Sequence, residues 1–321
     1  MASSSRDIAT TVIAPMVLLI VALTWAWVAR PSLFYTLYTQ VSARWHGMSN
    51  ERIDVAGHQV RAFVGKGRES ILLIHEFTSS KESWLPLATR LSDRYRVIAP
   101  DLPGIGASSR STQHDYDIPS QANRMIGLID MVDSGPVHLV GIGLGAEIAA
   151  AIAAQSPQRV ISVTLVAPTG FTTPTPSAYD QFEGGVDPLV ISSIDELKVT
   201  RETFLFQNPP ELSRPALHHK GDLNIRFRRF NQKVLAEARN GDNHIISTLP
   251  KINAPTQILW CEEDQYRDIS GLTTLAALKP NASAERLKNC GHMLPIAQPK
   301  RAADLINSFI LNPSQAPAAT R

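Results

Sequence analysis

Short apolar runs alternate with stretches of helical periodicity along most of this 321-residue chain. Runs such as ILLIH at 71–75, YRVIAP at 95–100 and VHLVGI at 137–142 have the length of buried strands. Between them, apolar residues recur every three or four positions, as they do on one face of a helix. Strands and helices that alternate in this way form a mostly parallel sheet with helices on both faces. The sequence therefore predicts an α/β fold.

The segment from about 171 to 250 interrupts this alternation. It contains the proline-rich stretches PTPSAYD at 174–180 and QNPPELSRP at 207–215, and a helix-like stretch with a basic face at 225–239. Such a segment suits a helical lid inserted over the sheet. The basic face is either solvated or in contact with an anionic membrane surface. We therefore expect a main domain at 31–312 with a lid insertion, and a flexible tail at 313–321.

The first 30 residues differ from the rest of the chain. Residues 8–29 carry no charge, and about 22 residues suffice to cross the hydrocarbon core of a membrane. Trp25 and Trp27, followed by Arg30, are typical of the membrane interface. The sequence predicts a single-pass N-terminal transmembrane helix, a signal-anchor, at 1–30; a cleaved signal peptide is the alternative. Few positive charges flank the segment, so the side of the membrane that the main domain occupies stays open.

Several function classes are disfavoured by the composition. The formal net charge is only +2 and long basic runs are absent from the sequence, so we do not expect nucleic-acid binding. His218, His219 and Lys220 lack the separated spacing of metal ligands, and no metal site is expected. The glycines after Val140 do not form a dinucleotide fingerprint, because its third glycine would fall at Ala146. We expect no cofactor.

Three strand ends carry the candidate chemistry. The stretch VHLVGIGLGAEIAAA at 137–151 has the layout of a hydrolase nucleophile elbow, G-x-S-x-G, but Gly143 stands at the apex where serine is usual. The backbone amides of Phe77 and Leu144 could form an oxyanion hole. Asp264 and His292 follow two later strands, in the order nucleophile, acid, histidine that α/β-hydrolases use.

The chain resembles the α/β-hydrolases, and within that superfamily it is most similar to the membrane-anchored monoacylglycerol lipases. The resemblance rests on HEFTSSKESW at 75–84, PTQILWCEEDQYRDISG at 255–271, LKNCGHM at 287–293 and QPKRAADLINSFI at 298–310. It implies an α/β-hydrolase fold and a lipid or small acyl ester as ligand. It further implies that His292 is the general base, that Asp264 orients it, and that Phe77 and Leu144 supply the oxyanion amides.

This chain departs from the family pattern at several positions together. Besides Gly143, it has Glu76 and Cys261 where glycine is usual, and Ile142 where a polar residue is usual. A laboratory inactivation would normally change the nucleophile alone, so we interpret Gly143 as natural divergence. We expect Glu76 to point outward as an inert residue; otherwise it lies beside the oxyanion hole as a perturbed acid or base.

The expected function is therefore that of a membrane-associated, lipase-like protein without ordinary serine turnover. One alternative is a pseudoenzyme that binds a lipid or a partner protein through the pocket under the lid. Another is a weak hydrolase in which His292 and Asp264 activate water directly. Cys261 and Cys290 follow neighbouring strands and could reach each other, but we expect two buried free thiols.

Overall fold

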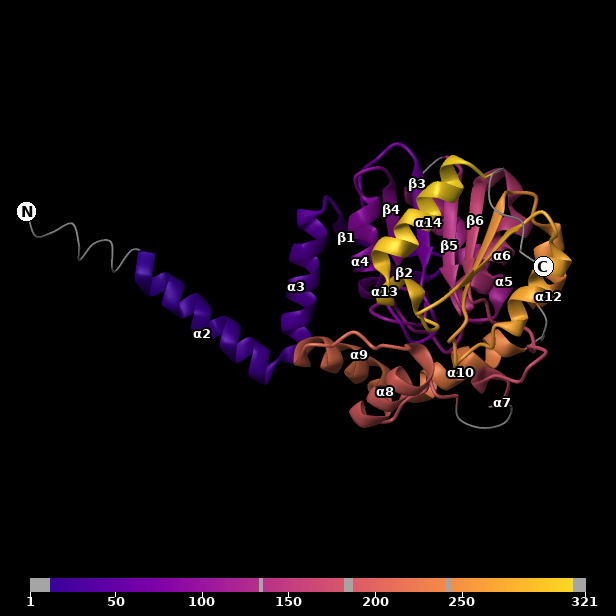
Figure 1. Cartoon of the computed structure of the whole chain (residues 1–321). Coiled ribbons are helices and arrows are strands. Elements are labelled where there is room, and N and C mark those ends of the chain that lie inside the picture. Colours follow the sequence, from indigo (N-terminus) through magenta and orange to yellow (C-terminus); the bar gives the residue numbers. More distant parts are fainter. Residues whose placement is uncertain (1–11, 133–134, 182–186, 241–243, 314–321) are drawn as a thin grey trace, which may run out of the picture.

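The computed structural model describes residues 12–132, 135–181, 187–240 and 244–313. Its centre is an eight-stranded sheet in the order β1-β2-β4-β3-β5-β6-β7-β8 (Figure 1). Strands β1 and β2 form a hairpin, β2 pairs antiparallel with β4, and all other neighbours are parallel. The strand bounds are β1 Ser49–Val55, β2 His58–Val64, β3 Ser70–Ile74, β4 Arg96–Pro100, β5 Val137–Ile142, β6 Val160–Val166, β7 Thr256–Cys261 and β8 Ser283–Leu287. The α/β fold predicted from the sequence is confirmed.

Helices cover both faces of the sheet, and each face has its own apolar core. One core packs α5 (Ile118–Val132), α6 (Leu144–Gln155) and α12 (Ser270–Leu278) on the sheet. The other packs α4 (Leu85–Leu91), α13 (Leu294–Ala297) and α14 (Pro299–Leu311) on the opposite face. Strands β3, β5 and β7 are buried along their whole length because they lie between the two cores.

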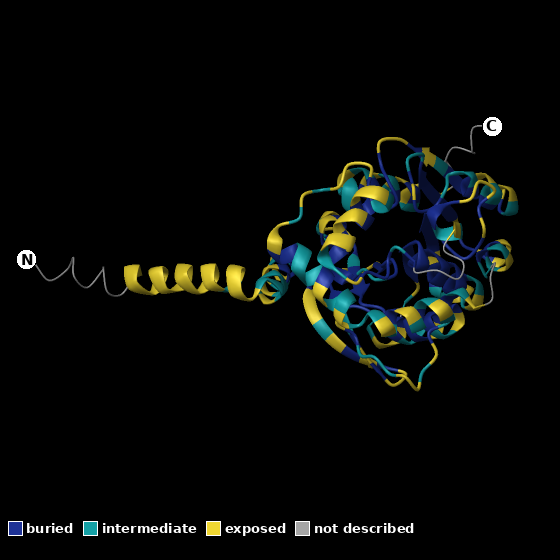
Figure 2. Ribbon diagram, turned by 90° about the horizontal axis from the view of Figure 1, so that it is seen from below, coloured by how far each residue is buried: buried dark blue, intermediate teal, exposed yellow. Residues whose placement is uncertain are grey.

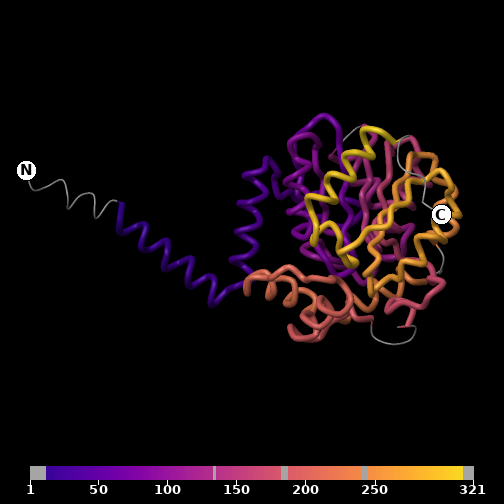
Figure 3. The backbone as a smooth tube through the Cα atoms, in the orientation of Figure 1, coloured from indigo at the N-terminus to yellow at the C-terminus, as the bar shows by residue number. Residues whose placement is uncertain are grey.

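The segment 171–250 forms a group of helices at one end of the sheet (Figures 1 and 3). Its helices are α7 Ala178–Gln181, α8 Ile194–Thr200, the π-helical turn η4 Arg201–Leu205, α9 Arg214–Arg226, α10 Arg228–Arg239 and α11 His244–Thr248. The helix-like stretch at 225–239 is divided at Phe227, which caps both α9 and α10. Residues 182–186 and 241–243 of the expected lid, and 314–321 of the expected tail, lie outside the described residues.

The N-terminal part forms two helices, α2 (Ala14–Ala29) and α3 (Pro31–Trp45). From residue 12 onward, none of the described helices has both the length and the apolarity needed to cross a membrane. The predicted transmembrane helix over 8–29 is therefore not supported. The 16 residues of α2 extend only about 24 Å at about 1.5 Å each, and the helix ends before Pro31. Residues 1–11 lie outside the described part.

Helix α2 projects away from the main domain with almost all of its side chains exposed (Figure 2). Helix α3 instead packs on α9 of the 171–250 segment. The Tyr35 ring lies 5.0 Å from the His219 ring, and Thr36 Oγ1 is 3.4 Å from His219 Nδ1. The chain that leaves α2 is thus in direct contact with the helices at the end of the sheet.

Cys261 and Cys290 form a disulfide, so the expectation of two free thiols was wrong. Parallel strands β7 and β8 end at the same edge of the sheet, with Cys261 opposite Leu287. Cys290 lies three residues beyond that position, and the two Cα atoms are 5.4 Å apart. This separation is within the range that disulfide geometry requires.

Candidate active site

The elbow predicted at Gly143 is present as backbone geometry. Gly143 lies between β5 and α6 with φ 52° and ψ −116°, a region that residues with a Cβ rarely adopt. Its flanking glycines permit close packing of strand against helix. A Cβ on Gly141 would lie 2.2 Å from the Gly145 carbonyl oxygen, and a Cβ on Gly145 would lie 2.1 Å from the Ile74 carbonyl oxygen. The sharp turn places the amide of Leu144 at the N-terminus of α6.

The two predicted oxyanion amides converge, but a side chain of the protein already occupies the space between them. Glu76, two residues beyond the end of β3, turns its carboxylate inward and is only 2% exposed. Its Oε1 accepts hydrogen bonds from the amide of Phe77 at 2.6 Å and from the amide of Leu144 at 3.1 Å. The expectation that Glu76 points outward was wrong. The positive end of the α6 dipole and two otherwise unpaired amides hold the carboxylate there.

Glu76 and Gly143 occupy one site that both side chains cannot share. A Cβ built on Gly143 would lie 1.3 Å from Glu76 Oε2 and 2.3 Å from Glu76 Cδ. The Glu76 carboxylate thus fills the space in which the side chain of an elbow serine would begin. The two departures from the family pattern are therefore linked sterically, because the absence of a side chain at 143 makes room for the carboxylate.

The predicted acid and base also meet in the structure. Asp264, after β7, and His292, after β8, bring Oδ2 and Nδ1 to 2.9 Å. The other oxygen of Asp264 accepts from the amides of Tyr266 at 2.9 Å and Arg267 at 2.8 Å, which fixes the carboxylate. The Tyr266 ring packs edge-on against the imidazole, with the ring centroids 4.9 Å apart. This arrangement orients His292 with Nε2 towards the elbow.

His292 Nε2 is not free, because it lies 2.8 Å from Glu76 Oε2. The imidazole is fully buried between two carboxylates. Burial opposes the charged form, but Asp264 and Glu76 outweigh this effect and raise the pKa of His292 to about 9. At neutral pH the group is an imidazolium that donates one N–H hydrogen bond to each carboxylate. As it stands, the centre presents neither a hydroxyl nucleophile, nor a free base, nor an empty oxyanion hole.

The turn that carries Glu76 is held by a second buried histidine. His75 Nε2 accepts from the amide of Leu102 at 2.9 Å, and Nδ1 lies 2.7 Å from the carbonyl oxygen of Glu76. Burial lowers the pKa of His75, so the ring is neutral and its Nδ1 is the donor. This fixes the backbone of Glu76 from the side opposite its carboxylate.

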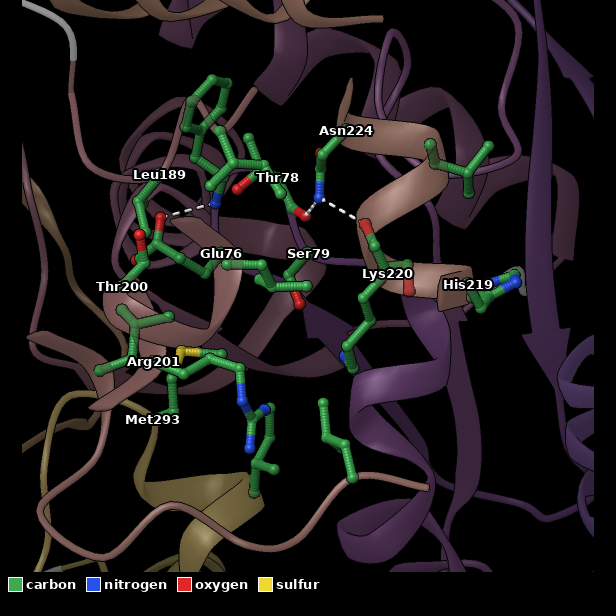
Figure 4. A pocket seen from close by; sticks show the side chains of 18 of the residues that line it. Glu76, Thr78, Ser79, Leu189, Thr200, Arg201, His219, Lys220, Asn224 and Met293 are labelled. Atoms are coloured by element: carbon green, nitrogen blue, oxygen red, sulfur yellow. Dashed lines mark hydrogen bonds between the residues drawn. The ribbon is translucent and has the colours of Figure 1, made fainter. Parts of the chain in front are cut away.

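The largest cavity described near this centre lies between the strand ends and the helices of 171–250 (Figure 4). It encloses about 850 Å³, part of it open to solvent, and Glu76 and Phe77 form one wall. Most of the remaining lining is apolar, with side chains from Leu189, Ile191, Leu197, Leu205, Phe206 and Met293. A smaller space of about 250 Å³ also adjoins Glu76 and is lined by Tyr179, Tyr266 and Glu147.

Two ionisable residues near the centre could not be recognised as part of the site from the sequence. Glu147 lies in the first turn of α6 and is 4% exposed; Thr169 donates to its Oε1, and its Oε2 has no hydrogen-bond partner among the described residues. Burial raises the pKa of Glu147 to about 8. Lys220 lines the large cavity from α9. An acidic residue inside the otherwise apolar run of α6 was a signal for the first, whereas Lys220 resembled any surface lysine.

Metal chemistry has no visible site in this region. Among the described residues, no group of three or more histidine, cysteine, aspartate or glutamate side chains is placed to hold a metal ion. The chemistry available to the site is therefore that of the Glu76, His292 and Asp264 cluster and of the cavity beside it.

Comparison with known proteins places this geometry in a family. Residues 71–305, more than half of the chain, match the model of the alpha/beta hydrolase family. The chain is 29% identical to monoacylglycerol lipase abhd6-B of Xenopus laevis over 256 residues, covering 76% of this chain and 75% of the relative. It is 28% identical to human monoacylglycerol lipase ABHD6, with the same coverage.

A solved structure gives a similar result. The crystal structure of a membrane phospholipase A, a bacterial virulence factor, superposes with a TM-score of 0.84 at 28% identity, covering 95% of this chain and 99% of that one. The sheet order, the elbow and the sequence matches agree. The chain belongs to the alpha/beta hydrolase family and has a fold of the lipase and esterase type.

Proposed function

We propose that this protein binds an acyl lipid or acyl ester in the cavity beside Glu76 and performs no serine-dependent hydrolysis. The observation that carries the proposal is the position of the Glu76 carboxylate, which contacts both oxyanion amides and His292 at once. An acyl carbonyl cannot enter the oxyanion hole while the carboxylate is there. The helices of 171–250 act in this proposal as a lid over the ligand.

The catalytic deficit implied by the site is large. Each missing oxyanion-hole donor costs about 10² to 10³ in kcat, and here both donors are engaged. A negative carboxylate also opposes the charge that develops on the oxygen of a tetrahedral intermediate. Serine is absent from position 143 as well. The protein is therefore proposed as a binding pseudoenzyme that retains the lipase architecture.

The apolar cavity supports a lipid as the ligand. Its lining of leucine, isoleucine, phenylalanine and methionine side chains suits an acyl chain. The relatives are described as lipases, and the similar solved structure as a membrane phospholipase. The ligand class proposed here, an acyl lipid, follows from both observations.

Association with a membrane is also part of the proposal. Helix α2 exposes large apolar side chains, with Leu18 69% and Leu19 56% exposed, and the helix contains no charged residue. A helix that is apolar on all sides requires a non-aqueous environment. We propose that it inserts into the surface region of a membrane, which would place the contact between α3 and α9 near the lipid phase.

A second candidate function is direct hydrolysis by a water molecule that His292 activates. The 2.9 Å contact between His292 and Asp264 favours it, because this is the pairing that a general base needs. It requires Glu76 to leave Nε2, so the reaction would occur only in a rearranged state. Wild-type hydrolysis that is abolished in His292→Ala would support this function.

Two assays test the binding function. A fluorophosphonate probe should give no adduct with the full chain, and displacement of a fluorescent fatty acid by monoacylglycerol should report saturable binding. Leu205→Glu places a charge in the apolar lining and should abolish displacement, whereas Lys300→Met, on the exposed face of α14, should not. A labelled serine, or unchanged binding in Leu205→Glu, would overturn the proposal.

A further inference from the structure

The large cavity is not electrically balanced. Among the described residues, its one acidic lining residue is Glu76, which shares the buried His292 imidazolium with Asp264. The cationic lining residues are Arg201 and Lys220. Burial lowers the pKa of the neighbouring His219, which leaves that ring neutral at pH 7. The cavity therefore has two positively charged lining residues against one carboxylate that is already engaged.

Lys220 is the cation that lacks a committed partner. No hydrogen bond, and no ion pair within 4.0 Å, joins its ammonium to a residue in the described part of the chain. The acid that acts on it electrostatically is Glu82, but Glu82 is bound to Lys81 at 2.7 Å. Figure 4 shows the Lys220 side chain extending from α9 into the space among the lining residues.

Arg201 increases the positive potential around Lys220. Its guanidinium donates to the carbonyl oxygen of Pro210 at 2.6 Å and lies over the Phe206 ring at 4.9 Å, and it is only 8% exposed. Burial is the main reason why the pKa of Lys220 falls to about 8, and repulsion from Arg201 adds to it. A second cation beside an unpaired lysine is costly unless an anion is present.

The occupied catalytic centre determines where the polar end of a ligand can go. In a working hydrolase the polar head of the acyl group sits in the oxyanion hole, next to the histidine. Here Glu76 holds both oxyanion amides and His292 Nε2. A ligand that enters the cavity must therefore place its polar head against another group, and Lys220 is the unpaired one.

We propose that Lys220 is the binding residue for the anionic head of a single-chain amphiphile, whose acyl chain lies along the apolar lining of the same cavity. The head is a carboxylate or a phosphate, since both match a lysine ammonium. The inference rests on the proposed function in one respect, namely that the cavity holds an acyl lipid. Beyond the proposed function, the inference specifies that the head of the ligand is negatively charged and that Lys220 selects it.

The experiment compares three probes with one alkyl chain: laurate, lauryl phosphate and lauryl alcohol. Titration calorimetry on the full chain at neutral pH should show the anions binding roughly tenfold or more tightly than the alcohol, as charge-assisted hydrogen bonds allow. Lys220→Met should remove this preference and leave binding of the alcohol unchanged. Whichever anion binds more tightly, laurate or lauryl phosphate, identifies the head as carboxylate or phosphate.

Matched variants keep the test independent of folding. Lys198→Met removes an exposed lysine of α8 and should keep the preference, and Lys220→Arg should restore it. Thermal unfolding of Lys220→Met should show no loss of stability, because the substitution removes a partly buried ammonium that has no ion-pair partner among the described residues. If that variant does not fold, equal affinity of the wild type for the anions and the alcohol would still refute the inference.

Three results are unfavourable, and they are distinguishable. Equal affinity of the wild type for anions and alcohol would overturn the inference while leaving a lipid-binding function intact. A preference that survives Lys220→Met but disappears in His292→Gln would place the anion at the catalytic centre and overturn it as well. Absence of binding for all three probes would instead refute the proposed function itself.

Discussion

Introducing serine at position 143 tests the steric link between Gly143 and Glu76. Backbone strain at a positive φ costs about 1 to 3 kcal/mol for a residue with a Cβ. The serine Cβ would also meet Glu76 Oε2 at 1.3 Å, so the carboxylate must leave His292 and both amides. Solvent replaces part of these contacts for the displaced carboxylate. A net loss of one hydrogen bond to a charged group, about 1.5 to 3 kcal/mol, together with the strain should lower the free energy of unfolding of Gly143→Ser by on the order of 3 to 6 kcal/mol.

Removing the carboxylate first should relieve most of this cost. In the Glu76→Gly background only the backbone strain remains, so Gly143→Ser should then cost about 1 to 3 kcal/mol. The two substitutions should therefore show a favourable coupling of about 2 to 3 kcal/mol in a double-mutant cycle. Urea unfolding of the wild type, both single variants and the double variant gives this coupling directly.

A control separates strain from collision. Gly47 also has a positive φ of 74°, but a Cβ there meets no atom within 4 Å. Gly47→Ser should thus lower the free energy of unfolding only by the backbone strain, about 1 to 3 kcal/mol. Fluorophosphonate labelling gives a second readout, since the double variant should react and Gly143→Ser alone should not. Two results would refute the position of Glu76 in the space of the serine side chain. One is that the stability changes of Glu76→Gly and Gly143→Ser add up in the double variant. The other is that Gly143→Ser alone is labelled by the probe and is as stable as the wild type.

Three further predictions concern other parts of the molecule. The pKa of His292 is raised from 6.5 to about 9, so its protonated form stabilises the fold by on the order of 3 kcal/mol below pH 6.5. This stabilisation is lost as the pH rises through 9. Glu76→Gln should flatten that loss in urea titrations, and an unchanged profile would contradict the role of the pair. Replacing Cys261 and Cys290, 29 residues apart, by alanine should cost about 3 to 4 kcal/mol in urea unfolding; no change in midpoint would argue against the bond. Leu18→Arg should reduce sedimentation with lipid vesicles, and full retention would rule out α2 as the membrane contact.

The elements of the site could be located from the sequence because each depends on a local pattern of residues. Gly143 follows a buried strand and precedes a small-residue helix, while Asp264 and His292 follow strands in a set order. Parallel strands bring their carboxyl ends to one edge, so these residues had to meet. The oxyanion amides followed in the same way, because they belong to the backbone and not to a side chain.

The orientation of Glu76 could not be predicted in this way. A carboxylate after a buried strand can face solvent or turn inward, and the choice depends on groups distant in sequence. The amide of Leu144 and the imidazole of His292 attract it inward, and the missing side chain at 143 gives it room. The disulfide and the position of Lys220 in the cavity lining depended on long-range contacts in the same manner.

Residue pattern and residue identity are enough to predict the fold, the strand ends that carry the site, and an elbow without serine. These follow from periodicity and from residue identity, which are local properties. Only the folded structure shows that Glu76 and Gly143 depend on each other. The Glu76 carboxylate, in the loop after β3, occupies the space that a side chain at position 143, after β5, would fill. This contact joins residues 76 and 143, which are 67 positions apart in the sequence. It exists only in the folded chain, because close packing brings the two segments together.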